Sequence, residues 1–336
     1  MSIWLDWPIK AQYGCIIVAG LWFSSCSASE PQVPKPVPVR AEHSDHQSLL
    51  PSWLWSEPLP SFDDLRPRHA PPLPRRPYTL EVMRQNVEAI PIEIAALTAI
   101  GIYSGLAEWH WGKQPFKITH EGWFGRNTYS GGADKVGHAY AAYVISDVLA
   151  WRLRVRGFND YESAMTGAIV SWLMMAMVEV GDGFSQYGAS PEDLAMDTIG
   201  VGFSVLRNTV PGTREKLDFR MEYIPSRYET FDFWGTDYSG KKWVLALKLA
   251  GFEPLRESPL RFVELHLGYY TRGYSDREQQ LRLPKSRVLY AGVGLNLSEL
   301  LFSQPPVRNS VPGTLARSIL EYIQVPYTYI ATAPRR

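Results

Sequence analysis

Cysteine is nearly absent from this chain of 336 residues, which contains only Cys15 and Cys26. A mature chain that began at Cys26 would therefore have no internal disulfide and no zinc site with several cysteine ligands. An excess of charge of one sign is also missing, because 34 basic residues balance 34 acidic ones. The chain therefore lacks the excess of basic residues that is typical of nucleic-acid binding.

Known catalytic signatures are absent as well. The sequence has no Gly-x-Ser-x-Gly nucleophile elbow, no His-Glu-x-x-His pair and no glycine loop that ends in Lys-Ser or Lys-Thr. Apolar runs of about twenty residues, the usual requirement for a membrane-spanning helix, are also missing. The apolar helices are therefore predicted to be buried in a compact body.

The amino terminus has the composition of a targeting segment. Lys10 precedes an apolar run over 13–23, which has the length of a signal-peptide hydrophobic region. Phe23-Ser24-Ser25-Cys26 resembles the bacterial lipobox, in which the cysteine receives the fatty acyl (palmitate) chains and becomes the first residue. We predict a lipoprotein signal peptide over 1–25 and lipidation at Cys26; an ordinary secretory signal or a weak anchor is the alternative. Ser27 after the cysteine is typical of transport to the outer membrane.

Composition divides the remainder into three parts. Residues 26–78 are rich in proline, which favours an extended tether. Residues 79–212 are predicted to be helical, with four helices over 88–106, 136–153, 164–180 and 193–206. Residues 213–336 alternate apolar and polar side chains and predict strands over 218–223, 243–249, 262–269, 288–297 and 325–330, with a short helix over 312–322. The predicted fold class is α+β, a hydrophobic four-helix bundle followed by a small antiparallel β-sheet.

Ionisable residues interrupt the apolar helices in three places. Their spacings of three or four residues place each pair on one helix face, and buried charges are costly unless they are paired or bind a metal. The pairs are Asp134 with His138, Glu179 with Asp182, and Asp193 with Asp197. We therefore predict that three helices direct these side chains toward a common site.

The clusters also resemble a known family. The segments Gly132-Ala133-Asp134-Lys135-Val136-Gly137-His138, Glu179 with Asp182-Gly183, and Asp193 with Asp197 and Gly200 resemble the YfiM-like family of predicted periplasmic lipoproteins, whose function is unknown. More distantly they resemble VanZ-like proteins. The close resemblance covers about 123–202, and it implies a periplasmic lipoprotein without implying any chemistry.

Several of these residues also have a purely structural interpretation. Asp134 follows two glycines and is predicted as a helix N-cap, a role that does not exclude one in the site. Lys135 is predicted to be a solvated charge; neutralisation of a neighbouring carboxylate is the alternative. Ser190-Pro191 predicts a helix start that would place Asp193 in the first turn, and Asp182-Gly183 has turn character. Capping cannot explain Asp197, one turn deeper.

Two chemistries and one structural role fit the predicted site. Asp134, His138, Glu179, Asp182, Asp193 and Asp197 are candidate ligands of a divalent metal, the only cofactor that the sequence suggests. Alternatively, His138, Glu179 and Asp197 form a metal-free acid–base set, or the cluster only fixes the helix register. Lys135, Tyr140 and Arg126 are weaker candidates for substrate binding.

The sequence thus predicts a lipid-anchored envelope protein at the periplasmic face of the outer membrane. Its candidate activity is a metal-assisted hydrolase or transferase acting on a lipid-linked or glycan substrate. The alternative is a non-catalytic protein, structural or binding lipid or a partner. The residues leave open whether the protein is an enzyme.

Overall fold

A computed structural model describes residues 77–227, 231, 233, 235–303, 307 and 310–333. The predicted signal peptide, Cys26 and nearly all of the predicted tether lie outside these residues. Helices form the first half of the described chain and strands dominate the second half, which confirms the α+β class.

The helical part contains the long helices α4, α5 and α6. They span Ala133–Val155, Asp160–Gly183 and Pro191–Thr209. Polar caps define two of their starts: the side chains of Asn159 and Ser190 accept hydrogen bonds from the first turns of α5 and α6. Each helix extends two to four residues beyond the predicted bounds at its start, because the caps lie outside the apolar pattern.

The first predicted helix, over 88–106, corresponds to α3, and a separate helix, α2, precedes it. Helix α2 spans Leu80–Ala89 and α3 spans Pro91–Ala107, and their axes differ by 82°. Pro91 occupies the first helical position of α3, where its missing N–H costs nothing, and it disfavours helical geometry at Ile90. The number of four bundle helices is therefore not confirmed, although the helices pack closely.

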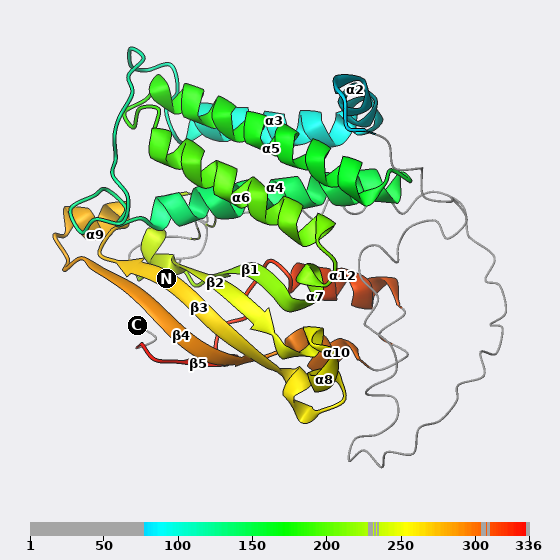
Figure 1. The fold of residues 1–336 in the computed structure, drawn as a ribbon. Coiled ribbons are helices and arrows are strands. Elements are labelled where there is room, and N and C mark those ends of the chain that lie inside the picture. Colours follow the sequence, from blue (N-terminus) through cyan, green and yellow to red (C-terminus); the bar gives the residue numbers. More distant parts are fainter. Residues whose placement is uncertain are drawn as a thin grey trace, which may run out of the picture.

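Within the described residues, α5 is the one helix long and apolar enough to cross a membrane, or two segments are if the bent pair α2 and α3 counts as one span. Within the apolar window of α5, 44% is buried inside the protein. Figure 1 shows α4 and α6 between the sheet and the outer helices α3 and α5. Helices α4 and α6 approach closely because Gly200 lies against Ala139, whose carbonyl oxygen would be 2.1 Å from a Cβ at position 200.

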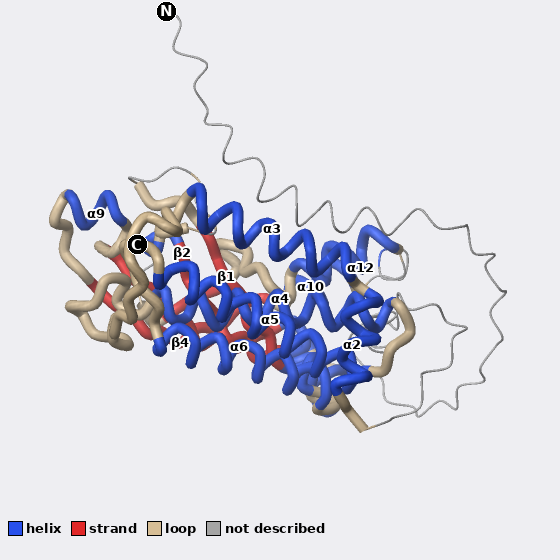
Figure 2. Tube along the Cα trace, turned by 90° about the horizontal axis from the view of Figure 1, so that it is seen from above, coloured by secondary structure: helices blue, strands red, loops and turns tan. Residues whose placement is uncertain are grey.

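Five strands form one antiparallel sheet in chain order. They are β1 Leu217–Tyr223, β2 Lys241–Lys248, β3 Val263–Arg272, β4 Ser286–Leu295 and β5 Tyr329–Ala331. Viewed from above, the long helices cross in front of the strands (Figure 2). The short helix α7, Thr213–Lys216, leads from α6 into β1. Short helical segments between the strands are α8 Glu253–Arg256, α9 Asp276–Gln280, α10 Leu297–Phe302 and α12 Val311–Ile319.

The sheet is rolled, because one segment contacts both of its edges. Met221 of β1 donates its N–H to the carbonyl of Tyr322 (2.9 Å) and accepts from the N–H of Gln324 (3.1 Å). A few residues later, β5 pairs with β4. The carboxyl-terminal segment therefore connects β1 to β4 across the roll.

The core between helices and sheet is aromatic. Tyr140 and Tyr143 of α4 pack with Met221 and Trp243 of the sheet, so one apolar cluster joins the two layers. Next to it, the buried guanidinium of Arg207 in α6 pairs with the carboxylates of three residues from different elements. These are Asp147, Asp218 and Glu321.

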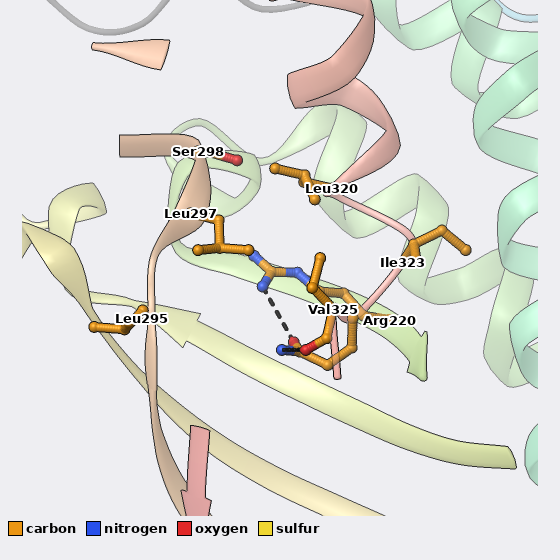
Figure 3. Close-up of a pocket in the computed structure, with 8 residues that line it drawn as sticks. Arg220, Leu295, Leu297, Ser298, Leu320, Ile323 and Val325 are labelled. Carbon is orange, nitrogen blue, oxygen red and sulfur yellow. Dashed lines mark hydrogen bonds between the residues drawn. The ribbon is translucent and has the colours of Figure 1, made fainter. Parts of the chain in front are cut away.

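The inner face of the roll carries ion pairs beside a cluster of tyrosines and small apolar residues. The guanidinium of Arg220 pairs with the carboxylates of Asp218 and Glu264, and the ammonium of Lys242 lies 2.7 Å from Glu222. Figure 3 shows a small pocket at the end of the roll, where Arg220 lies among apolar side chains such as Leu295. Because carboxylates already neutralise Arg220, this pocket is a poor anion site.

Candidate functional site

The imidazole of His138 lies at the centre of a polar cluster that α4, α5 and α6 build together. Its Nδ1 atom is 3.2 Å from Oδ1 of Asp197 on α6 and 3.6 Å from Oε1 of Glu179 on α5. Its Nε2 atom is 4.0 Å from Oδ1 of Asp134, one turn earlier on α4. Three helices thus bring their ionisable residues to one imidazole.

The start of α4 sets the position of Asp134. Gly132, with φ of 89°, is the N-cap residue, so the prediction that Asp134 caps this helix is wrong. Glycine adopts this left-handed conformation without strain, which lets the helix begin at Ala133. The carboxylate of Asp134 is therefore free to accept a hydrogen bond of 3.1 Å from the hydroxyl of Tyr238, which follows β1.

Lys135 is a buried ion-pair partner, and the prediction of a solvated charge is wrong. Only 1% of its side chain is exposed. Its ammonium lies 2.5 Å from Glu121, 2.8 Å from Asp193 and 3.4 Å from Asp134. An isolated buried ammonium would be strongly destabilising, so these three carboxylates must offset its loss of hydration.

The carboxylates of α5 are held by the segments on either side of the cluster. Oε2 of Glu179 accepts from the backbone N–H of Ser190 at 2.8 Å. Oδ1 of Asp182 accepts from Nε1 of Trp111 at 2.8 Å. The Trp111 ring lies against Gly105 and Gly181, where a Cβ would come within 2.3 Å of it. These glycines let the loop before α4 pack over the cluster.

The carboxylates of α6 each keep one oxygen without a hydrogen-bond partner. Ser190 caps α6 and its Oγ accepts from the N–H of Asp193, which confirms the predicted helix start. Oδ2 of Asp193 contacts Lys135, whereas its buried Oδ1 has no partner among the described residues. Oδ2 of the fully buried Asp197 is likewise unpartnered within the described structure. Buried carboxylate oxygens in this state are suited to bind a cation.

Crowding of like charge perturbs the acid–base behaviour of the cluster. Burial, strengthened by nearby carboxylates, raises the pKa of Glu179 to about 8 and that of Glu121 to about 7. Burial likewise raises the pKa of Asp182 to about 6.

Attraction between opposite charges controls the shifts of His138 and Asp134. Burial opposes protonation of His138, but the carboxylates of Asp193 and Asp197 raise its pKa well above the usual value. The positive charges of His138 and Lys135 lower the pKa of Asp134 despite its burial. Six carboxyl groups therefore face one ammonium and one imidazole, so additional positive charge would stabilise the cluster.

In the part of the chain that the structure describes, two sets of three ligand atoms are compact enough to hold an ion. Within each set all ligand atoms lie within 4.8 Å of one another. One set is Asp134, His138 and Asp193, and the other is His138, Glu179 and Asp197. Asp182 belongs to neither. One imidazole with several carboxylates is a donor set that suits zinc, iron or manganese.

Of the three weaker substrate-binding candidates, Lys135 lies within the cluster and Tyr140 is directed into the core. The hydroxyl of Tyr140 donates to the carbonyl of Tyr322 inside the core (2.7 Å). Arg126 is exposed in the loop before α4. Sequence reasoning missed the roles of Glu121, Tyr238 and Trp111, all of which come from outside the three helices. The only local sequence feature that pointed to these roles was the concentration of aromatic residues around Trp111 and Glu121.

Comparison with known proteins finds one family model that matches part of the chain. Residues 120–209 match the model of a family described as predicted periplasmic lipoprotein (DUF2279). The matched segment contains α4, α5 and α6 together with Glu121, and it confirms the predicted resemblance to periplasmic lipoproteins there. A lipoprotein family implies a periplasmic location and a lipid anchor in a membrane. No curated protein and no solved structure gives a significant match to the chain.

Proposed function

We propose that the chain is an outer-membrane lipoprotein, anchored through Cys26, whose cluster around His138 binds a divalent cation. The cation serves hydrolysis or transfer of an ester or phosphoryl group on a lipid-linked or glycan substrate of the envelope. The observation that carries this proposal is the pair of buried, unpartnered carboxylate oxygens on Asp193 and Asp197, which flank one shared imidazole.

Solvent access favours the set formed by Asp134, His138 and Asp193 as the ligands. The side chains of Asp134 and His138 are 22% and 15% exposed, whereas Asp197 is fully buried. A catalytic cation needs an open coordination position. We call the more exposed set, Asp134, His138 and Asp193, the outer set, and His138, Glu179 and Asp197 the inner set; the exposure favours the outer set. When bound there, a divalent cation would polarise a substrate oxygen and lower the pKa of a bound water.

The inner carboxylates have a supporting role in this arrangement. With Nε2 directed to the outer set, Nδ1–H of His138 donates to Asp197, which fixes the tautomer and the orientation of the ring. Lys135 holds Asp193 in place through its Oδ2 atom. Glu179 lies next to the same imidazole and is the candidate proton acceptor.

One observation favours a non-catalytic alternative. The network around Lys135 connects the loop before α4 with α4 and α6, and Tyr238 connects Asp134 to the sheet side. Such a network can fix the packing of the helices without any reaction. In that case the protein would be a structural or lipid-binding component of the outer membrane.

Metal analysis of the mature chain with Cys26→Ser distinguishes these functions. We expect near-stoichiometric divalent metal in this protein, loss of metal in Asp193→Asn and His138→Ala, and retention in the control Asp160→Asn, an exposed acid at the start of α5. Metal-loaded protein is then screened for esterase and phosphatase activity.

Absence of metal after purification without chelators, together with strong destabilisation of the site variants, would favour the structural function. Metal that persists in Asp193→Asn but is lost in Asp197→Asn and Glu179→Gln would move the ion to the inner set.

A further inference from the structure

The outer face of strands β2 to β5 is aliphatic and exposed. Register places Leu245, Leu267 and Ala291 in one row across the sheet. The neighbouring row contains Leu247, Leu265, Val293 and Ile330. We call this surface the aliphatic face; it comprises Leu245, Leu247, Leu265, Leu267, Leu289, Ala291, Val293, Leu295 and Ile330. Leu289 and Ile330 are 70% and 77% exposed, so the described helices do not cover its far side.

The opposite face of the same strands is buried and combines polar with aromatic and small apolar residues, among them Val244, Tyr270 and Tyr290. Glu264 and His266 of β3 alternate with Leu265 and Leu267, yet these polar residues point into the roll and the leucines point outward. A sheet folding in water gains free energy when its aliphatic side is the buried one. An exposed aliphatic side, opposite a buried side that carries charged groups, is the pattern of strands whose outer side faces lipid.

One end of the aliphatic face carries aromatic and then basic residues. The ring of Tyr269, opposite Leu289 in the register, contacts the ring of Phe124 with centroids 5.5 Å apart. Arg287, the next outward-facing residue of β4, donates to the carbonyl of Phe124. The connection between β3 and β4 adds the exposed cations Arg277 and Arg282. Aromatic rings followed by cations are typical of the boundary between acyl chains and anionic headgroups.

We propose that the aliphatic face inserts into the acyl region of an anionic membrane, with the Arg287 end at the level of the headgroups. The face contains none of the aromatic, methionine or arginine side chains that are enriched at the centre of protein interfaces. A chain with a lipid anchor already lies at a membrane surface, so the insertion costs little additional entropy of association. This inference does not depend on the proposed metal site.

Vesicle flotation of the full mature chain with Cys26→Ser tests the proposal, because that variant has no lipid anchor. The vesicles contain phosphatidylethanolamine and phosphatidylglycerol. We expect the parent to float with them. The triple variant Leu289→Glu/Val293→Glu/Ile330→Glu should reduce the bound fraction at least about tenfold, since three carboxylates would enter the acyl region. These side chains are exposed, so the thermal transition should change little, and metal content should equal that of the parent.

The matched control is Leu106→Glu/Leu173→Glu/Ile199→Glu, which places the same charges on exposed positions of α3, α5 and α6. We expect it to float like the parent. Loss of binding in this control with retention in the sheet variant would overturn the proposal in favour of a helical membrane surface. If the parent does not float, and if it is a dimer that the sheet variant converts to a monomer, then a second copy covers the face and the proposal is overturned. No flotation and no change of oligomeric state would also overturn it.

Discussion

Replacement of Lys135 by methionine tests the electrostatic description of the site most directly. Methionine keeps the unbranched chain but removes the ammonium that contacts Glu121, Asp134 and Asp193. Removal of one partner from a buried ionic group costs about 3–5 kcal/mol, because the remaining charges stay buried without compensation. For a chain of this size we expect a fall in Tm of roughly 10 °C at pH 7.

The pH dependence of this loss provides a second check. The carboxyl groups left behind can become neutral by protonation, so the destabilisation should shrink as the pH falls from 7 toward 5. Excess divalent cation should also restore part of the lost stability, because it would supply the missing positive charge. Thermal melts of Lys135→Met and of the exposed control Lys113→Met, recorded from pH 5 to 8 with and without metal, measure all three effects. A loss at pH 7 below about 1 kcal/mol would refute the description of Lys135 as a buried ion partner.

Further predictions concern the acids, the metal and the helix contact. The pKa values of Glu179, Glu121 and Asp182 are raised in the folded state. The stability that these groups confer is therefore present below their unfolded pKa of about 4 and is lost as the pH rises toward 8. Denaturant titrations of the metal-free protein should show this decline, and Glu179→Gln should reduce it; an unchanged slope would contradict the raised pKa. Under the metal hypothesis, a divalent cation at 100 times its Kd should increase the unfolding free energy by about 2.7 kcal/mol, and a chelator should reverse the gain in a thermal melt. Gly200→Ala should destabilise the protein by about 1–3 kcal/mol in denaturant unfolding, because its Cβ would meet the Ala139 carbonyl, whereas Gly202→Ala, with open space around it, should not.

Sequence periodicity predicted the helices that carry the site because their apolar pattern is local. Periodicity could not predict the sharp bend between α2 and α3 at Ile90. The proline at position 91 marked the first turn of a helix, but the change of direction depends on how α2 and α3 pack. Sequence periodicity could not predict the rolled shape of the sheet either. The pairing of Met221 with the segment around Ile323 joins residues about one hundred positions apart, and no local pattern encodes such a contact.

The candidate site shows the same division. Spacing on single helices placed Asp134 with His138 and Asp193 with Asp197, and the structure brings those pairs together around the imidazole. The predictions for Asp134 as a cap and for Lys135 as a solvated charge failed for related reasons. Gly132, not Asp134, is the N-cap residue of α4. The partners of Lys135 come from α6 and from the loop before α4. Both depend on tertiary contacts.

The aliphatic face and the candidate metal site are connected by the loop before α4. The ring of Phe124 lies against Gly132, where a Cβ would be 2.3 Å away, and it also contacts Tyr269 at the boundary of the aliphatic face. Gly132 caps the helix whose first turn carries Asp134. If the aliphatic face lies in the acyl region, the exposed side of the His138 cluster therefore lies close to the headgroups. This placement favours, among the proposed substrates, an amphiphile whose polar group extends out of the bilayer. Metal-dependent activity on such a substrate should then fall in Leu289→Glu/Val293→Glu/Ile330→Glu when the substrate is presented in vesicles. Activity on the same polar group in soluble form should not change.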